Sequence, residues 1–323
     1  MEPDSTAAYL AVAGELVIVG KEPDGDSVRF RADDPGLYQR IPDQRHQVDL
    51  SADGTVQLRF EGVDAPEAHY QASSSARQAR GAQPLGIEAR DALLARIGFS
   101  DVRFAAPGST RVVASRPATV RALILTRMVE VNGRPVAYLL LDEEGGDLPA
   151  NGATVALDQA LLDRTLNVWL LRQGLAYLLL YSSNPPEQRA RLRALAAGSR
   201  GAGVSPGGAR GPVWLRDASA AFVLDGATSI GPGGQPVFPK LFRRAFDYVH
   251  DVERHGFAGT LVDWLLAGAR LAELEASHPG AGNENDQVSV AGAEPVRLSD
   301  LLQADGDKVS LSADVLDLVF VEK

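Results

Sequence analysis

The chain has 323 residues, of which 45% are hydrophobic and 23% charged, and 32 Lys and Arg against 42 Asp and Glu give it a formal net charge of -10. This composition is typical of a soluble globular protein of about two domains. Because the sequence contains no Cys, disulfides, thiolate metal sites and a cysteine nucleophile are excluded. Any chemistry must use oxygen and nitrogen groups.

The charge and hydropathy patterns bear on location and partners. The N-terminus is acidic where a secretory signal would be basic, and no uncharged apolar run reaches the roughly 18 residues of a membrane span. We therefore expect no signal peptide, no membrane association and a cytoplasmic location. Residues 218–323 hold 8 basic and 16 acidic residues, and this acidity argues against a second nucleic-acid surface there, because like charges repel phosphate.

Strand-like segments dominate the first half of the chain. Residues 55–63 alternate hydrophobic and polar, which is the period of a half-buried strand. Asp-Gly and Asn-Gly pairs, the turn chemistry of β-hairpins, precede or join the strand-like runs. The pattern predicts five strands joined largely by turns, as in a small barrel, at residues 16–19, 27–31, 55–63, 119–129 and 136–141.

Helical spacing follows in three places. Apolar residues recur every four positions at 85–97, and residues 157–173 keep helical spacing up to Gly174. Asn184, followed by two prolines and Glu187, predicts the N-cap of a third helix over 185–197. A Gly-rich stretch at 198–211 follows, and we expect a domain boundary near Asp217, separating residues 1–217 from 218–323.

The C-terminal third carries a different pattern. Residues 238–277 predict two helices split around 256–259, and a polar loop over 278–286 precedes short strands at 288–290, 309–311 and 316–321. This describes a small α/β appendage of unknown function, which resembles no family. Docking onto the barrel, binding of a protein partner and regulation all remain open for it.

Three separated motifs carry the chemistry. The first is Asp-Gly-Asp-Ser at 24–27, the second is the segment RFEGVDAPE at 59–67, and the third is Asn-Gly-Arg-Pro at 132–135. Together they resemble the thermonuclease (staphylococcal-nuclease-like) family, whose pattern is a DGD[ST] hairpin, then R-x4-D-[AT]-P-E, then a Gly-Arg pair. The segment NVWLLRQGLA at 167–176 matches the family's later helix end. The resemblance covers roughly residues 10–217 and implies an OB-fold-type five-stranded Greek-key barrel with three helices.

The resemblance also implies roles for particular residues. Asp26 and Asp64 would bind a calcium ion through their carboxylates, with the backbone carbonyl of Ala65 as a third ligand and Asp24 as an outer-shell acid. In the same scheme Glu67 orients or deprotonates the attacking water, and two arginines, Arg59 and Arg134, hold the scissile phosphate. The chemistry is consistent, because a hard cation takes oxygen ligands and guanidinium groups bind phosphate in two-pronged fashion.

Each motif has a simpler interpretation when taken alone. Asp-Gly-Asp is usually only a turn, and Asn-Gly-Arg is most often a hairpin with a solvated Arg. The chain contains a second such segment, Asp-Gly-Asp-Lys at 305–308, with no companion motif after it, and we interpret it as a plain turn. The functional interpretation depends on the three motifs occurring together and in order.

The sequence departs from the family pattern in two respects. Residues 33–51 form a longer connection than the family has, which would cover the active site or extend its phosphate-binding face. Asn132 stands where some members have a Tyr, so the candidates for stacking on substrate bases are Tyr177 and Tyr181.

Taken together, the motifs predict a calcium-dependent nuclease that cuts DNA and RNA with little sequence specificity, and the resemblance implies that it leaves 3′-phosphate ends. Two alternatives remain. One is a barrel that binds nucleic acid or protein without cutting, and the other is a phosphodiesterase for a smaller substrate.

Overall fold

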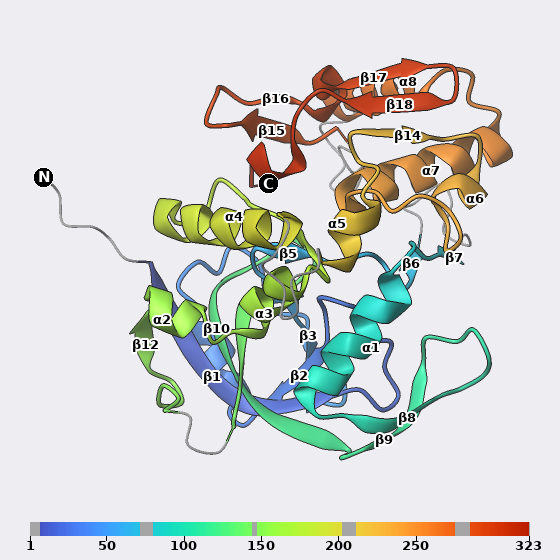
Figure 1. Cartoon of the computed structure of the whole chain (residues 1–323). Helices are drawn as coiled ribbons and strands as arrows, with labels where there is room; N and C mark the ends of the chain where they lie inside the picture. The colour runs from blue at the N-terminus through green and yellow to red at the C-terminus, as the bar shows by residue number, and fades with distance from the viewer. Residues whose placement is uncertain (1–6, 72–79, 144–146, 202–210, 275–284, 323) are drawn as a thin grey trace, which may run out of the picture.

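The computed structural model describes residues 7–71, 80–143, 147–201, 211–274 and 285–322. The predicted α+β class is confirmed, and the main sheet curves into a nearly closed barrel (Figure 1). Its strands follow the order β3-β2-β1-β10-β11-β4, with β12 added on β1. The bounds are β1 (Ala8–Val17), β2 (Arg29–Ala32), β3 (Val56–Gln57), β4 (Arg59–Phe60), β10 (Thr119–Val129), β11 (Pro135–Leu141) and β12 (Thr154–Ala156).

One short segment supplies the strands at both ends of the sheet. β3 pairs with β2 at one end of the sheet and β4 pairs with β11 at the other, although only Leu58 separates the two strands in sequence. The Leu58 N–H donates to the carbonyl oxygen of Val28 at 3.0 Å. The single strand predicted over residues 55–63 is therefore wrong as one unit: it is divided into β3, β4 and β5 (Val63–Asp64), because its parts pair with different neighbours.

The first strand is longer than predicted, and Gly14 explains why. β1 begins at Ala8 and pairs with β10 from Leu10 to Val17. A Cβ at Gly14 would lie 2.2 Å from the carbonyl oxygen of Arg31 on β2, so glycine here permits a close approach of backbones rather than ending the strand. The predicted hairpins at Asp24-Gly25 and Asn132-Gly133 are confirmed by the antiparallel pairs β1–β2 and β10–β11.

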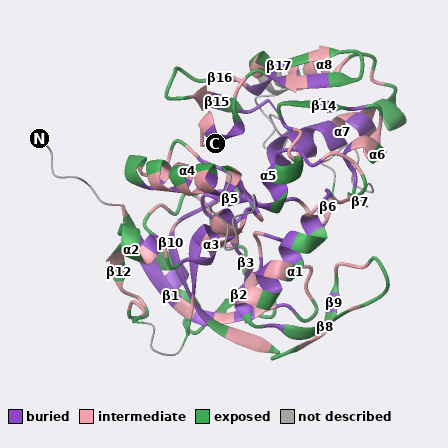
Figure 2. Cartoon of the chain, in the orientation of Figure 1, coloured by how far each residue is buried: buried purple, intermediate pink, exposed green. Residues whose placement is uncertain are grey.

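Helices cover the barrel on one side (Figures 1 and 2). The helix predicted over 157–173 is wrong as one unit, because the Thr165 hydroxyl accepts the N–H of Val168 and begins a new helix there. Asn184 is not an N-cap; Pro185 holds that position, and the buried Asn184 side chain bonds elsewhere. The helices are α1 (Gly86–Ile97), α2 (Gln159–Leu162), α3 (Leu166–Gln173), α4 (Pro186–Arg200), α5 (Pro212–Arg216), α6 (Ala227–Ile230), α7 (Pro239–His255) and α8 (Leu261–Leu274), with 3-10 turns at Pro35–Arg40, Leu298–Leu301 and Val315–Asp317.

The C-terminal region has the helix pair and short strands that were predicted. α7 and α8 flank residues 256–260, and the second Asp-Gly-Asp segment turns the chain between two paired strands, as expected. Much of the predicted Gly-rich stretch and polar loop falls at 202–210 and 275–284, outside the described residues. The remaining strands are β6 (Tyr70–Gln71), β7 (Arg80–Gly81), β8 (Ser100–Phe104), β9 (Val112–Arg116), β13 (Tyr177–Leu178), β14 (Ala221–Val223), β15 (Gln287–Val290), β16 (Val296–Arg297), β17 (Leu302–Asp305), β18 (Lys308–Leu311) and β19 (Leu318–Phe320).

The C-terminal region packs directly on the barrel region, and buried side chains of both belong to one hydrophobic cluster. Figure 2 shows buried residues in both regions. Phe320 of β19 exchanges backbone hydrogen bonds with Leu180 and Ser182, at 2.8 and 2.7 Å. Phe238, which precedes α7, packs its ring 5.8 Å from that of Tyr177. These backbone and aromatic contacts hold the C-terminal region against the barrel region.

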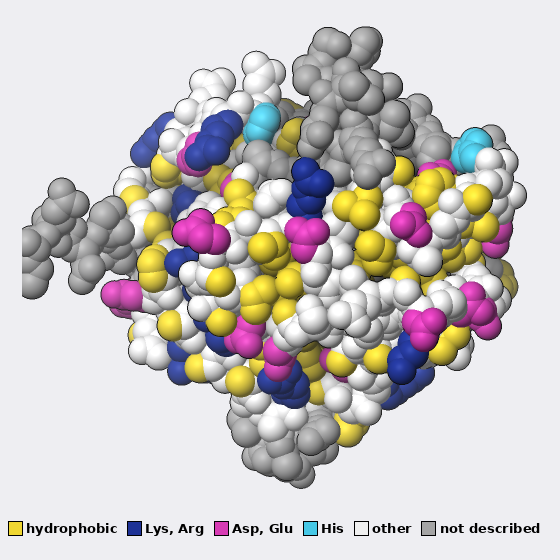
Figure 3. Space-filling model, turned by 90° about the horizontal axis from the view of Figure 1, so that it is seen from above, with side chains coloured by type: hydrophobic (Ala, Val, Ile, Leu, Met, Phe, Trp, Pro, Cys, Tyr) yellow, Lys and Arg dark blue, Asp and Glu magenta, His cyan; other side chains and the backbone are white. Residues whose placement is uncertain are grey.

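The exposed face seen in Figure 3 mixes basic, acidic and hydrophobic side chains without a continuous basic surface. Among the helices that the structure describes, none has the length and apolar character needed to cross a membrane.

Candidate active site

The first two acids of the site lie in the Asp24-Gly25-Asp26 hairpin. Asp24 accepts backbone N–H groups from Gly25 at 2.7 Å and Ala68 at 2.9 Å, and Asp26 accepts the N–H of Ala65 at 3.0 Å. A Cβ on Gly25 would lie 2.7 Å from the Cβ of Ala65, so only glycine lets the hairpin pack this closely. The hairpin is thereby fixed against residues 64–68, which brings together two motifs that the resemblance assigns to one site.

The other two acids lie on that second segment. Asp64 ends β5, where it is paired with Tyr177 of β13. The Glu67 N–H donates to the Gln83 side chain at 3.1 Å, while the Gln83 amide donates to the Val237 carbonyl oxygen at 2.8 Å. The position of Glu67 is therefore coupled to the chain that leads into α7.

Burial brings these carboxylates into electrostatic conflict. Burial, and then the charge of Asp26, raise the pKa of Asp24 to about 7. Burial, followed by the charges of Asp64 and Glu67, raises the pKa of Asp26 to about 7 as well. Burial also raises the pKa of Glu67 to about 8, against the opposing charge of Arg243. Such a cluster is fully ionised only when a cation compensates it.

The two predicted arginines lie at the same cavity. Arg59 Nη2 donates to the Tyr181 hydroxyl at 2.7 Å, and the guanidinium carbon lies 5.3 Å from the centre of that ring. Arg134 forms a two-pronged ion pair with Glu130, with Nε 3.0 Å from Oε1 and Nη2 3.3 Å from Oε2. Both guanidinium groups thus have anionic or polar partners that a phosphate would have to replace or share.

A cavity of about 570 Å³ joins these residues. The acids Asp24, Asp26, Asp64 and Glu67 line it together with Arg59, Arg134 and Tyr181. Three residues of the 33–51 connection also line the cavity: Asp43, Arg45 and His46. Their position is consistent with the prediction that this segment covers the site or extends its phosphate-binding face.

The two tyrosines predicted to stack on bases have different surroundings. Tyr177 does not line the cavity; it is completely buried, its hydroxyl donates to Asp217 at 3.0 Å, and its ring packs 5.1 Å from that of Trp214. Its expected stacking role is therefore wrong in this arrangement, because β13 turns the side chain into the core. Tyr181 does line the cavity, where it contacts Arg59.

The residues present fit a calcium ion in chemical terms. Calcium takes oxygen ligands from carboxylates and carbonyls, and Asp26 is hydrogen-bonded to the N–H of Ala65, directly after Asp64 in the chain. Within the described ranges no three His, Asp or Glu side chains are already placed as a metal site, but the implied set needs only two carboxylates and a carbonyl. The compensating cation present here belongs to the protein itself: the Arg243 guanidinium, on Asp64 and Glu67.

Three basic residues of α7 line the cavity and were missed in the sequence: Lys240, Arg243 and Arg244. Arg243 Nη2 lies 2.7 Å from Asp64 Oδ2, and its Nη1 pairs with Glu67 Oε1. Lys240 and Arg244 instead pair with Asp286, at 3.3 and 2.8 Å. The sequence around a basic residue on an amphipathic helix does not indicate that the residue belongs to an active site, because only the docking of α7 brings it to the acids.

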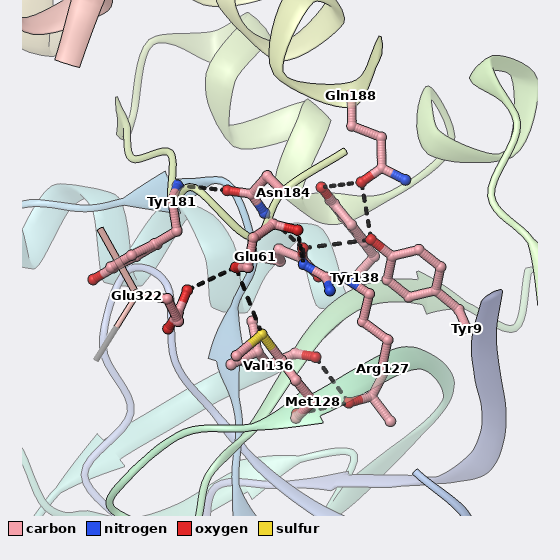
Figure 4. Close-up of polar contacts among 12 residues, drawn as sticks. Tyr9, Glu61, Arg127, Met128, Val136, Tyr138, Tyr181, Asn184, Gln188 and Glu322 are labelled. Carbon is pink, nitrogen blue, oxygen red and sulfur yellow. Dashed lines mark hydrogen bonds and ion pairs between the residues drawn. The ribbon is translucent and has the colours of Figure 1, made fainter. Parts of the chain in front are cut away.

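A buried polar network supports the barrel beneath the site (Figure 4). Glu61 Oε1 accepts from the Asn184 amide at 2.7 Å and from the Arg127 guanidinium at 3.4 Å, while Tyr9 donates to Gln188 at 2.9 Å. These bonds join β1, β10 and α4 to the residue that follows β4. Arg59 of the candidate site lies in β4, two residues before Glu61.

No protein-family model matches the chain, and a search of curated proteins finds no match. The resemblance to the thermonuclease family therefore rests on the residues of the three motifs.

Proposed function

We propose that this protein is a calcium-dependent phosphodiester hydrolase that cuts DNA and RNA with little sequence specificity, built on an OB-fold barrel of the thermonuclease type. One observation carries the proposal. Four buried or half-buried acids and two arginines, which the resemblance carried by three separated motifs implies as a set, line a single cavity: Asp24, Asp26, Asp64, Glu67, Arg59 and Arg134.

The roles follow from chemistry. A calcium ion held by Asp26, Asp64 and the Ala65 carbonyl would polarise the phosphoryl group and offset its developing charge. The bound cation would favour the ionised form of Glu67, whose pKa burial raises in its absence, and the carboxylate could then accept a proton from the attacking water. Arg59 and Arg134 would hold the phosphate and stabilise the negative charge of the transition state. In this reaction the water oxygen would bond to phosphorus as Glu67 takes its proton, and the bond to the 5′ oxygen would break. That oxygen would take up a proton and leave as a 5′-hydroxyl, so that a 3′-phosphate remains.

The experiment is hydrolysis of end-labelled single-stranded DNA by the purified protein, first with calcium and then with a chelator. We expect cutting only with calcium, and products that gain a free 3′-hydroxyl only after phosphatase treatment. Cutting that persists in chelator would overturn the calcium-dependent mechanism. Failure to cut, in folded protein that still binds DNA, would instead support the non-catalytic binding alternative.

A second candidate is supported by the walls of the cavity. Residues of the 33–51 connection and of α7 line it, and its volume of about 570 Å³ lies in the range of small-molecule sites. A phosphodiesterase acting on a dinucleotide or another small diester would suit such a space. Hydrolysis of bis(p-nitrophenyl) phosphate without cutting of DNA would identify this activity, and cutting of both substrates would favour the nuclease.

A further inference from the structure

Arg243 occupies the centre of the candidate site although it belongs to the C-terminal region. Its guanidinium group joins Asp64 and Glu67, the residues to which the proposed function assigns the cation and the attacking water. The Arg243 side chain is 17% exposed, so the contact is shielded from bulk water but open to the cavity. The same two carboxylates cannot keep this contact unchanged while they serve a bound cation and a water.

The backbone of α7 is held in place beside the site. Phe242 and Phe246 pack edge-to-face on Tyr70, with ring centres 5.9 and 5.7 Å from it. The Tyr70 hydroxyl also donates to Asp247 at 3.0 Å, and Gly81 leaves room that a Cβ would take from Phe246. Movement at Arg243 is therefore expected in its flexible side chain rather than in the helix.

The surrounding charges indicate where that side chain goes. A cation on Asp64 would repel the guanidinium of Arg243, which now lies 2.7 Å from the same carboxylate. Arg59 is close enough to Asp64 and Arg243 for both charges to act on its guanidinium. An anion bound in the cavity would attract the guanidinium groups of both Arg59 and Arg243. A phosphate group suits this role because it accepts two-pronged hydrogen bonds from guanidinium.

We propose that Arg243 is a phosphate-binding residue of this active site, held on Asp64 and Glu67 until a divalent cation replaces it there and the substrate phosphate receives it. The proposal rests on the proposed function, and it makes the C-terminal region a working part of the site. The substrate contacts are then shared by arginines from both regions: Arg59 and Arg134 from the barrel and Arg243 from α7.

The test compares Arg243→Gln, which removes the charge, with Arg243→Lys, which keeps it without the two-pronged geometry. Arg254→Gln is the matched control, because Arg254 is exposed in the last turn of the same helix. Calorimetry first measures calcium affinity without substrate, and then the affinity for thymidine 5′-phosphate at saturating calcium. KM and kcat for a small diester complete the set.

For Arg243→Gln we expect calcium to bind roughly tenfold tighter, because its competitor is gone, and the nucleotide to bind roughly tenfold weaker, because a charge-assisted contact is lost. KM should rise accordingly. Arg243→Lys should recover part of the nucleotide affinity, and Arg254→Gln should match the wild type in every measurement.

Two results would overturn the proposal. Unchanged calcium affinity in Arg243→Gln would show that Arg243 and the cation do not compete. Tighter calcium binding with unchanged nucleotide affinity and KM would leave Arg243 as a blocking group without a role toward substrate. Both results come from the variants, whereas a wild-type protein that binds no calcium would remove the proposed function itself, so the two failures are distinguishable.

Discussion

The barrel region and the C-terminal region place their charged residues by different means. In the barrel, Asp24 and Asp26 accept backbone N–H groups from the segment that follows β5, so turn and strand geometry determine where the carboxylates lie. In the C-terminal region, Arg243 reaches the same cavity because aromatic side chains dock α7 against Tyr70. Local backbone chemistry leaves a motif in the sequence, and tertiary docking does not.

The largest expected effect concerns the barrel acid that takes the proton. Glu67→Gln should lower turnover by about 10³-fold or more, since general-base and electrostatic contributions are lost together. The fold should persist, because the amide can still bond to Arg243. Single-turnover hydrolysis and circular dichroism measure the two quantities, and near-normal turnover would remove Glu67 from the mechanism.

Arg134→Ala tests the second barrel contribution, the arginine that now pairs with Glu130. We expect turnover to fall roughly 10²-fold, as when one donor to a transition-state anion is removed, with calcium binding preserved. The control is Arg103→Ala, an exposed arginine of β8 that does not line the cavity. Equal turnover in Arg134→Ala and Arg103→Ala would mean that Arg134 has no role in catalysis and serves only the hairpin.

Phe242→Ala tests whether aromatic docking supports the C-terminal contribution. Phe242 is completely buried, and truncation of such a side chain costs about 3–5 kcal/mol of unfolding free energy. Urea unfolding of the variant should show this loss. The control is Val252→Ala in the same helix, because Val252 is 37% exposed and its truncation should change the free energy of unfolding by less than about 0.5 kcal/mol. A loss as small as that of Val252→Ala would mean that α7 is held by other contacts.

The smallest expected effect is a pH dependence in the barrel network. Burial raises the pKa of Glu61 above its ordinary value of 4.5, although the charge of Arg127 opposes the shift. The folded protein then binds more protons than the unfolded chain above pH 4.5, so this carboxyl lowers stability as pH rises. Glu61→Gln should make the fall in stability with pH shallower than in the wild type.

The midpoints of urea unfolding, measured at a series of pH values from 4.5 upward, test the Glu61 prediction. The control is Glu88→Gln, because Glu88 is exposed in the first turn of α1. The other buried acids contribute equally to all three proteins, so the difference between curves isolates Glu61. A Glu61→Gln curve parallel to that of the wild type would contradict the predicted contribution.

Sequence reasoning anticipated most of the barrel elements because their signals are local. Asn132-Gly133 predicted the hairpin that β10 and β11 form. Gly174 predicted the end of a helix, and it caps α3 with a φ of +60°. It failed where the outcome depends on distant partners: Gly14 lies inside β1 because β2 approaches it, and Asn184 turns inward to bond Glu61 instead of capping α4.

The candidate site divides along the same line. The four acids and two arginines were expected from the family resemblance that the three motifs carry, and they line one cavity. Arg243 was missed because its partners, Asp64 and Glu67, lie far away in sequence and are joined to it only through the packing of α7. Tyr177 was misplaced for the same reason, since the partners that bury its side chain, Asp217 and Trp214, lie far away in sequence.

The most direct test of the central claim is calcium titration of the wild-type protein and of Asp26→Asn by calorimetry, with hydrolysis of single-stranded DNA measured on the same samples. If the barrel acids hold the catalytic cation, the wild type should show one saturable calcium site and a hydrolysis rate that follows the occupancy of that site. Asp26→Asn should lose both calcium binding and hydrolysis. Undiminished calcium binding by Asp26→Asn, or hydrolysis that does not follow occupancy, would contradict the account.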